Sequence, residues 1–218
     1  MRSTLYIEKR RLNDSTLLGG LSVRKKSHIL LGKCLAHNLD SRDLAFHKKA
    51  FCFGNVLPDL KPSFVTVRHE FDVNFDVVCK KIKKLAEDCT FLDRYTSGYW
   101  VKMGEVAHYV ADYFTFPHNA HYTGTLVDHT YYEADLKNQM KEYILAGEAE
   151  KHCRRNVEFR SLEDVITFIK KAHELYAMKE RCVEDDIQFI ITVTYQVIQG
   201  MIRLMEEKFA PKMAPVFA

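Results

Sequence analysis

Residues 108–133 of the chain concentrate imidazole and carboxylate side chains. This stretch holds four of the ten histidines. His108 and Asp112 are four residues apart, as are His129 and Glu133, so on helices each pair would project from one face toward a shared point. Imidazole and carboxylate are ligands that zinc accepts, and several of them converging is typical of an open catalytic site. The pattern therefore predicts a metal site in which cysteine takes no part.

Three further candidate ligands lie upstream: His28, Asp59 in G-N-V-L-P-D, and His69 in V-R-H-E-F-D. Each has an ordinary explanation when taken alone. His28 suits a hydrogen-bonded histidine on an apolar helix face, and Asp59 suits a turn. Their occurrence together with the dense stretch makes all three candidates for the same site.

The whole set resembles the zinc-dependent phospholipase C family, which shares its all-helical fold with the S1/P1 nucleases. The resemblance rests on H-Y-x-x-D-x-x-x-x-x-H and H-x-x-x-E downstream, and on S-H-I-L-L, P-D and a single histidine upstream. These motifs place the matching residues at His28, Asp59, His69, His108, Tyr109, Asp112, His118, His129 and Glu133. The resemblance runs from about residue 27 to residue 136 and keeps the order and core spacings of the motifs.

The resemblance implies a multinuclear zinc centre. One ion would be held by Asp59, His69, His108 and Asp112, and a second by His118, His129 and Glu133. A third ion, the open question, would use His28 and share Asp112. The implied chemistry is attack on phosphorus by a metal-activated water, with Asp59 as the general base or as the group that orients that water.

The chain departs from the family pattern at two places. Secreted members supply an N-terminal tryptophan to the third metal, whereas the single tryptophan here is Trp100. Choline-selective members line the headgroup pocket with aromatic rings where this chain has Leu60 and Thr66. We therefore expect two zinc ions with the third site open, and no particular preference for phosphatidylcholine.

The predicted function is a metal-dependent phosphodiester hydrolase of the phospholipase C type. Its predicted partner is a phosphoester substrate, for which a phospholipid headgroup is one candidate. An S1/P1-like nuclease or nucleotidase stays open, and only under that alternative would the protein act on nucleic acid. A non-catalytic metal-binding helical module is the third alternative.

His121 lies three residues after His118. We expect it either at the surface or as a second-layer residue that contacts a ligand and not the metal.

Composition sets the remaining limits. The formal net charge is +3, but residues 1–53 carry eleven Lys or Arg against four Asp or Glu, and residues 98–136 carry one lysine against five acids. Bound cations would neutralise that acidic surplus. The six cysteines are scattered without a C-x-x-C pair, which predicts reduced, buried thiols. No membrane-spanning run and no convincing signal peptide is evident, so we expect a cytoplasmic protein.

Helical periodicity dominates the chain, and strand-like alternation is nearly absent. Helices are expected over 28–38, with Ser27 as the N-cap, and over 42–53, 75–92, 97–114, 126–146, from 161 onward, and 183–209. An ordered loop should cover 55–64, because Pro58 and Pro62 do not fit a helix interior. The prediction is a single compact all-α domain of the phospholipase C/P1 nuclease type over 27–209. A basic extension (1–26) would precede this domain and a tail (210–218) would follow it.

Overall fold

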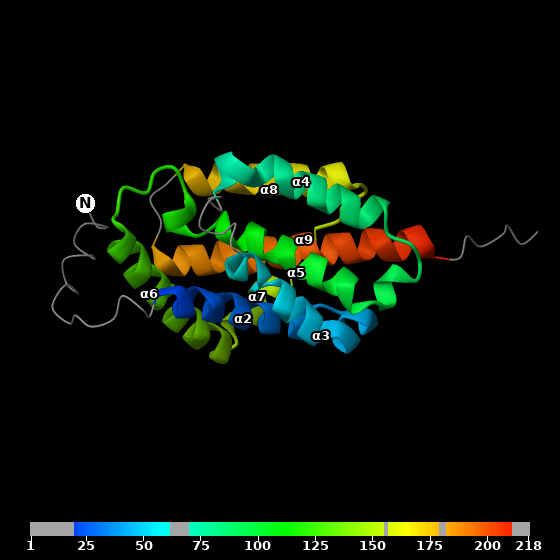
Figure 1. The fold of residues 1–218 in the computed structure, drawn as a ribbon, viewed down its shortest axis with the longest axis horizontal. Helices are drawn as coiled ribbons and strands as arrows, with labels where there is room; N and C mark the ends of the chain where they lie inside the picture. The colour runs from blue at the N-terminus through cyan, green and yellow to red at the C-terminus, as the bar shows by residue number, and fades with distance from the viewer. Residues whose placement is uncertain (1–19, 62–69, 155–156, 179–181, 211–218) are drawn as a thin grey trace, which may run out of the picture.

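The structure, a computed structural model, describes residues 20–61, 70–154, 157–178 and 182–210. Within those ranges it contains eight α-helices, three short 3-10 helices and no strand, which confirms the all-α prediction (Figure 1). The α-helices are α2 (Gly20–Asn38), α3 (Arg42–Gly54), α4 (Phe71–Glu87), α5 (Ser97–Asp112), α6 (Leu126–Leu145), α7 (Glu148–Cys153), α8 (Leu162–Ala177) and α9 (Val183–Phe209). The 3-10 helices are η1 (Leu57–Leu60), η3 (Asp93–Tyr95) and η4 (Phe116–His118).

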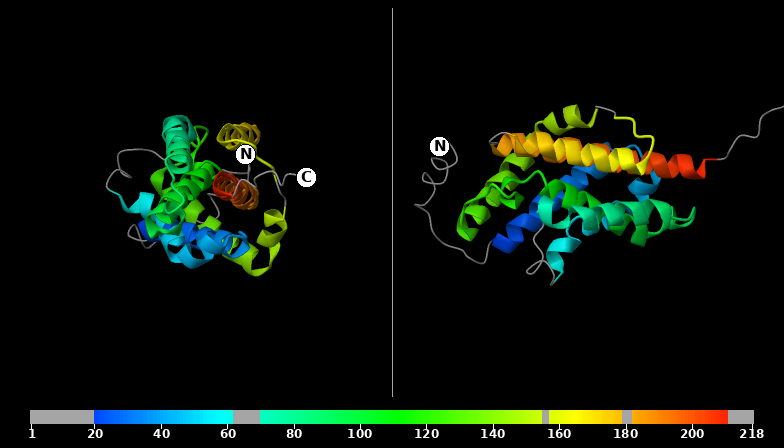
Figure 2. Two further views of the ribbon diagram at one scale, coloured as in Figure 1. Left: turned by 90° about the vertical axis from the view of Figure 1, so that its right-hand side faces the viewer. Right: turned by 90° about the horizontal axis from the view of Figure 1, so that it is seen from above.

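Helix α9 is the axis of the molecule. It packs against α5, α6, α7 and α8, and the end-on view of Figure 2 places it among the other helices. Its apolar residues recur on several faces, and Ile187, Ile191, Val197 and Ile198 are almost completely buried. A helix that is apolar around much of its circumference must lie inside the protein, which explains why the longest helix is central.

Helix α5 is the second buried helix, and it crosses α3 at very close range. A β-carbon added to Gly54 of α3 would overlap the carbonyl of Val101, and one added to Gly104 of α5 would overlap the carbonyl of Phe51. The two glycines therefore let the two backbones touch. This crossing places the end of α3, and η1 after it, directly beside the part of α5 that carries His108.

Several helix boundaries were predicted correctly from local signals. Helix α9 has the expected bounds, and α6 begins at Leu126 as expected, behind a capping box formed by Thr125 and Asp128. Ser161 caps α8, its hydroxyl accepting a bond from the Asp164 N–H at 3.1 Å. The start of α8 was predictable because a cap is an interaction between neighbours in sequence.

Other boundaries were predicted wrongly. Helix α2 begins at Gly20 and not at Ser27, because nothing in the preceding segment breaks the helix, and Ser27 is an interior position. Helix α4 covers Phe71–Glu87 and not 75–92. Thr96 and not Ser97 caps α5, its hydroxyl accepting from the Tyr99 N–H at 3.3 Å. The six-residue helix α7 was missed because it is too short to show a periodic pattern.

All six cysteines have free thiols, as predicted, but their burial differs from the prediction. Cys34, Cys89 and Cys153 are buried, whereas Cys182 is exposed at the start of α9. Among the residues that the structure describes, no helix is both long enough and apolar enough to span a membrane.

Candidate metal centre

Seven of the eight predicted ligands converge in the structure. Helix α2 supplies His28, η1 supplies Asp59, α5 supplies His108 and Asp112, η4 supplies His118, and α6 supplies His129 and Glu133. The eighth, His69, lies outside the described residues. Segments that are far apart in the sequence thus bring four imidazoles and three carboxylates to one place.

Asp112 lies at the centre of the cluster. Its Oδ1 is 3.2 Å from Nε2 of His28, and its Oδ2 is 3.2 Å from Nε2 of His108 and 3.5 Å from Nδ1 of His118. Asp59 approaches from η1, with Oδ1 3.7 Å from Nε2 of His108. One carboxylate therefore contacts histidines from three separate elements.

The second part of the cluster lies between η4 and α6. Oε1 of Glu133 is 3.3 Å from Nε2 of His118 and 2.9 Å from Nε2 of His129. His129 and Glu133 are neighbours because residues four apart share a helix face, as the sequence predicted. Ligand atoms of His28, His108 and Asp112 lie within 4.8 Å of one another, as do those of His118, His129 and Glu133.

Most of these separations suit a shared cation better than they suit direct hydrogen bonds, although that of His129 and Glu133, at 2.9 Å, lies in the hydrogen-bond range. Two zinc ligands at about 2.0–2.1 Å from the ion, placed at a tetrahedral angle, are roughly 3.3 Å apart. Four of the imidazole–carboxylate separations fall between 3.2 and 3.5 Å, whereas charge-assisted hydrogen bonds are shorter, at about 2.7–2.9 Å. The donor set, which is all imidazole and carboxylate, therefore fits zinc in both chemistry and spacing.

The orientation of His108 gives independent support for this fit. Its ring is fully buried, and Nδ1 lies 3.0 Å from the carbonyl oxygen of Asn55, which can only accept a bond. Nδ1 must then carry the proton, so in the neutral ring Nε2 directs a lone pair at the oxygens of Asp112 and Asp59. A cation placed between these lone pairs would offset their mutual repulsion.

The electrostatics of the metal-free cluster agree with this reading. Burial and the neighbouring charge of His28 lower the pKa of His108, so a second proton on its ring is disfavoured. Burial opposes protonation of His28, but the hydrogen bond to Asp112 and the charges of Asp112, Asp59 and Glu133 raise its pKa. Although burial alone would raise it, the neighbouring charge of His118 holds the pKa of Asp112 well below its usual range.

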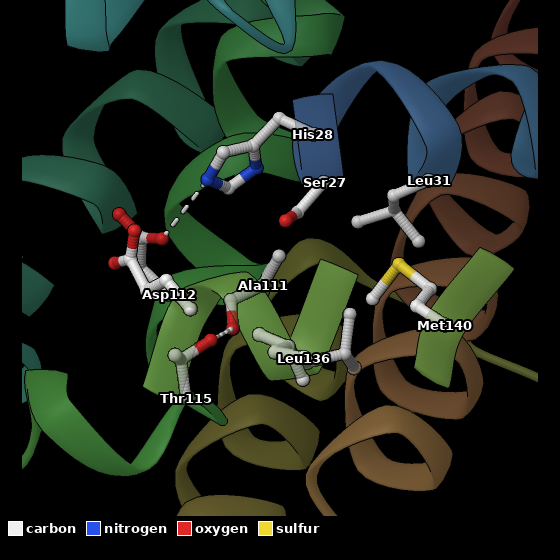
Figure 3. A pocket seen from close by; sticks show the side chains of 10 residues that line it. Ser27, His28, Leu31, Ala111, Asp112, Thr115, Leu136 and Met140 are labelled. Atoms are coloured by element: carbon white, nitrogen blue, oxygen red, sulfur yellow. Dashed lines mark hydrogen bonds and ion pairs between the residues drawn. The ribbon is translucent and has the colours of Figure 1, made fainter. Parts of the chain in front are cut away.

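A pocket opens beside His28 and Asp112 (Figure 3). Leu31, Leu136 and Met140 lie on the side away from these two residues and give it an apolar wall. The Nδ1 atom of His28 is buried and has no hydrogen-bond partner among the described residues. The pocket is therefore polar and ligand-rich on one side and apolar on the other.

The remaining histidines behave largely as ordinary residues. His121 is exposed, in agreement with the prediction. His173 has a structural role that the sequence did not suggest. Its ring stacks on Phe71 with 3.8 Å between the ring centroids, and its Nε2 lies 2.8 Å from Oδ1 of Asn119. Asn55 was also missed, because it acts through its backbone carbonyl and the side-chain type gives no signal.

Comparison with known proteins agrees with the geometry. A family model described as zinc dependent phospholipase C matches residues 27–183, which is more than half of the chain. The chain belongs to this family, and the matched segment contains all eight predicted ligands. Neither the curated proteins nor the solved structures gave a match.

Proposed function

We propose that this protein is a zinc-dependent phosphodiester hydrolase of the phospholipase C type. The observation that carries the proposal is the arrangement around His108, where a ring nitrogen with a fixed lone pair faces two buried carboxylates. Family membership supports the same conclusion. The substrate would be a phosphoester, with a phospholipid headgroup as the leading candidate.

The residues divide into two ligand groups under this proposal. His108, Asp112 and Asp59 would hold the first ion together with His69, and His118, His129 and Glu133 would hold the second. His28 faces Asp112 at 3.2 Å and would be available to a third ion. When bound, the ions supply Lewis acidity, which lowers the pKa of water and neutralises charge on the phosphate oxygens.

Asp59 would be the catalytic carboxylate. It lies on η1, where Pro58 fixes the backbone at the start of a 3-10 helix, and its side chain is buried. Oδ1 faces Nε2 of His108 at 3.7 Å, so Asp59 is close to the centre without being among its tightest contacts. It is therefore placed to accept a proton from water or to orient that water toward phosphorus.

An S1/P1-like nuclease or nucleotidase is the second candidate. The ring of Tyr122 is only partly buried, and its centroid lies 5.8 Å from that of His129. A half-exposed aromatic ring beside the ligands is a surface on which a nucleobase could stack. The two candidates share their metal chemistry and differ in the group that is attached to the phosphate.

A substrate panel tests the proposal and separates the candidates. The zinc-loaded protein would be assayed on phospholipid vesicles, bis-p-nitrophenyl phosphate, RNA and 3'-nucleotides. We expect hydrolysis of the phospholipid and of the model diester. Activity on nucleic acid alone would select the nuclease, and zinc binding without turnover on any phosphoester would select the non-catalytic module.

Two substitutions assign the roles. Asp112→Asn on α5 should reduce zinc content and activity together. Asp135→Asn, a change at a buried carboxylate on α6 that is not a candidate ligand, should keep both. Asp59→Asn should lower kcat by about 10²–10⁴-fold while at least one zinc ion stays bound. The exposed-site control His121→Gln should leave activity unchanged.

A further inference from the structure

Among the residues that the structure describes, Asp186, in the first turn of α9, is a carboxylate outside the ligand cluster with hydrogen bonds to three separate elements of the fold. Its side chain is fully buried and accepts three hydrogen bonds. Oδ2 accepts from the hydroxyl of Tyr132 at 2.6 Å and from the backbone N–H of Phe116 at 2.8 Å, and Oδ1 accepts from the hydroxyl of Tyr176 at 2.7 Å. Each donor belongs to a different element of the fold.

Two of these donors lie within two residues of candidate metal ligands. Phe116 begins the 3-10 helix η4, which ends at His118. Tyr132 immediately precedes Glu133 on α6. A single oxygen atom, Oδ2 of Asp186, therefore ties the segment that carries His118 to the helix that carries Glu133. The third donor, Tyr176, comes from α8, on which no candidate ligand lies.

The far end of the same segment is also fixed. Asn119 follows His118, and its side-chain amide donates to the carbonyl of Thr115 at 2.9 Å, while its Oδ1 lies 2.8 Å from Nε2 of His173. His118 is thus fixed on both sides by side chains that do not themselves touch the ligand cluster. Such partners set the orientation of a ligand before the ion arrives.

We propose that Asp186 is a positioning residue, which holds His118 and Glu133 at the separation that the second ion requires. The inference rests on the proposed metal site. It goes beyond that site because none of the three hydrogen-bond donors to Asp186 is a candidate ligand. Asp186 also lies after the segment that matches the family, residues 27–183. Helix α9, the axis of the fold, thereby sets the geometry of a site to which it contributes no ligand.

The competing explanation is that Asp186 only stabilises helix α9, because an acidic residue in the first turn of a helix has that effect. The neighbouring Asp185 provides a matched control. Its carboxylate accepts from the backbone N–H of Cys182 at 3.0 Å and caps α9 without bonding to Tyr132 or Phe116. Loss of Asp185 should therefore affect α9 without moving the metal ligands.

The test measures zinc affinity directly, by competition with a chromophoric chelator, in the full chain. His129→Ala first identifies which of the wild-type affinities belongs to the second site. Asp186→Asn and Tyr132→Phe should then weaken that affinity by about 10–100-fold and leave the other within twofold. Asp185→Asn should leave both affinities within twofold, even where it lowers the melting temperature.

A spectroscopic signature provides a second measurement. With Co²⁺ in place of zinc, the visible absorption assigned to the second site should change in Asp186→Asn and Tyr132→Phe but not in Asp185→Asn. The inference is overturned if Asp186→Asn lowers only the melting temperature, or weakens both sites equally. Tyr132→Phe removes a single hydroxyl, and so it tests the idea even where Asp186→Asn does not fold. A wild-type protein that binds no zinc would instead overturn the proposed function.

Discussion

Single residues set the chemistry of this site through their proton positions. His108 has one nitrogen committed to the carbonyl of Asn55, so the other is fixed as an acceptor facing Asp112. Three residues before His108 on the same helix, the carboxylate of Glu105 is paired with cationic side chains. Lys61 and Lys81 donate to its two oxygens at 2.8 and 2.9 Å. Helix α5 therefore carries two buried carboxylates with different partners, one surrounded by histidines and the other by lysines.

The Glu105 cluster makes stability depend on pH. Although burial alone would raise it, hydrogen bonds from Lys61 and Lys81 lower the pKa of Glu105 below its ordinary value. A carboxyl whose folded-state pKa is depressed stabilises the protein above its unfolded pKa of about 4.3, and this contribution is lost as pH falls through the folded pKa. Because the lysines are about two-fifths exposed, we expect Glu105→Gln to cost only about 1–2 kcal/mol at pH 7.

Urea unfolding of metal-free wild type and Glu105→Gln at several pH values measures this contribution. The difference in the free energy of unfolding should be constant from pH 7 down to about 5 and should shrink below about 4. A difference that persists unchanged at pH 3 would contradict the assignment to the ionised carboxylate.

At the level of elements, the crossing of α3 and α5 determines where the site can form. Gly54 and Gly104 each face a backbone carbonyl of the other helix, so the helix axes approach as closely as backbones allow. The same crossing places the carbonyl of Asn55 against His108. Two glycines that carry no functional group therefore control the orientation of a candidate ligand.

We expect Gly104→Ala to lower the free energy of unfolding by about 2–3 kcal/mol, because the added methyl forces the two helices apart. Gly98→Ala, near the start of the same helix, has no atom within 4 Å of the added methyl. It should stabilise the protein by up to about 1 kcal/mol through helix propensity and the unfolded state. Chemical denaturation of both variants tests this, and equal effects in the two would show that close packing at Gly104 is not the cause.

Several helix signals were readable from the sequence, and others were not. Ser161 with Asp164 marked a real helix start because capping is local. The capping box of Thr125 and Asp128 at the start of α6 is a local signal of the same kind that the sequence analysis did not use. Ser27 looked like an equivalent start but lies inside α2, because a cap residue can also occupy a helix interior. A sequence pattern can therefore identify a helix more securely than it identifies the helix's first residue.

At the level of the whole molecule, five elements bring three buried carboxylates close together, and four histidines face them among the described residues. Bound cations would balance the negative charge of these carboxylates. Zinc should therefore bind the folded protein far more tightly than the unfolded chain. An ion that binds the folded state alone adds about 2.7 kcal/mol when it is present at 100 times its dissociation constant.

Removal of zinc should lower the melting temperature. For a chain of this size, about 2.7 kcal/mol corresponds to roughly 5–10 °C. Scanning calorimetry of zinc-loaded and chelator-treated protein measures the change, and re-addition of zinc should restore the original value. In Asp112→Asn, which weakens the metal centre, chelation should lower the melting temperature much less. A wild-type melting temperature that does not respond to chelation would contradict the metal centre.

The sequence by itself determined the helical class and the identity of the candidate ligands. The helical class and four of the ligands depend on short spacings, namely the helical repeat of apolar residues and the four-residue separations of His108 from Asp112 and of His129 from Glu133. His28, Asp59 and His69 were identified by their occurrence with this stretch and by the family resemblance. Only the tertiary structure decided that Asp112 faces histidines from α2, α5 and η4, that glycines set the α3–α5 crossing, and that Asp186 on α9 ties η4 to α6. These contacts join residues that are distant in sequence. They arise when the whole core packs, so no local pattern encodes them.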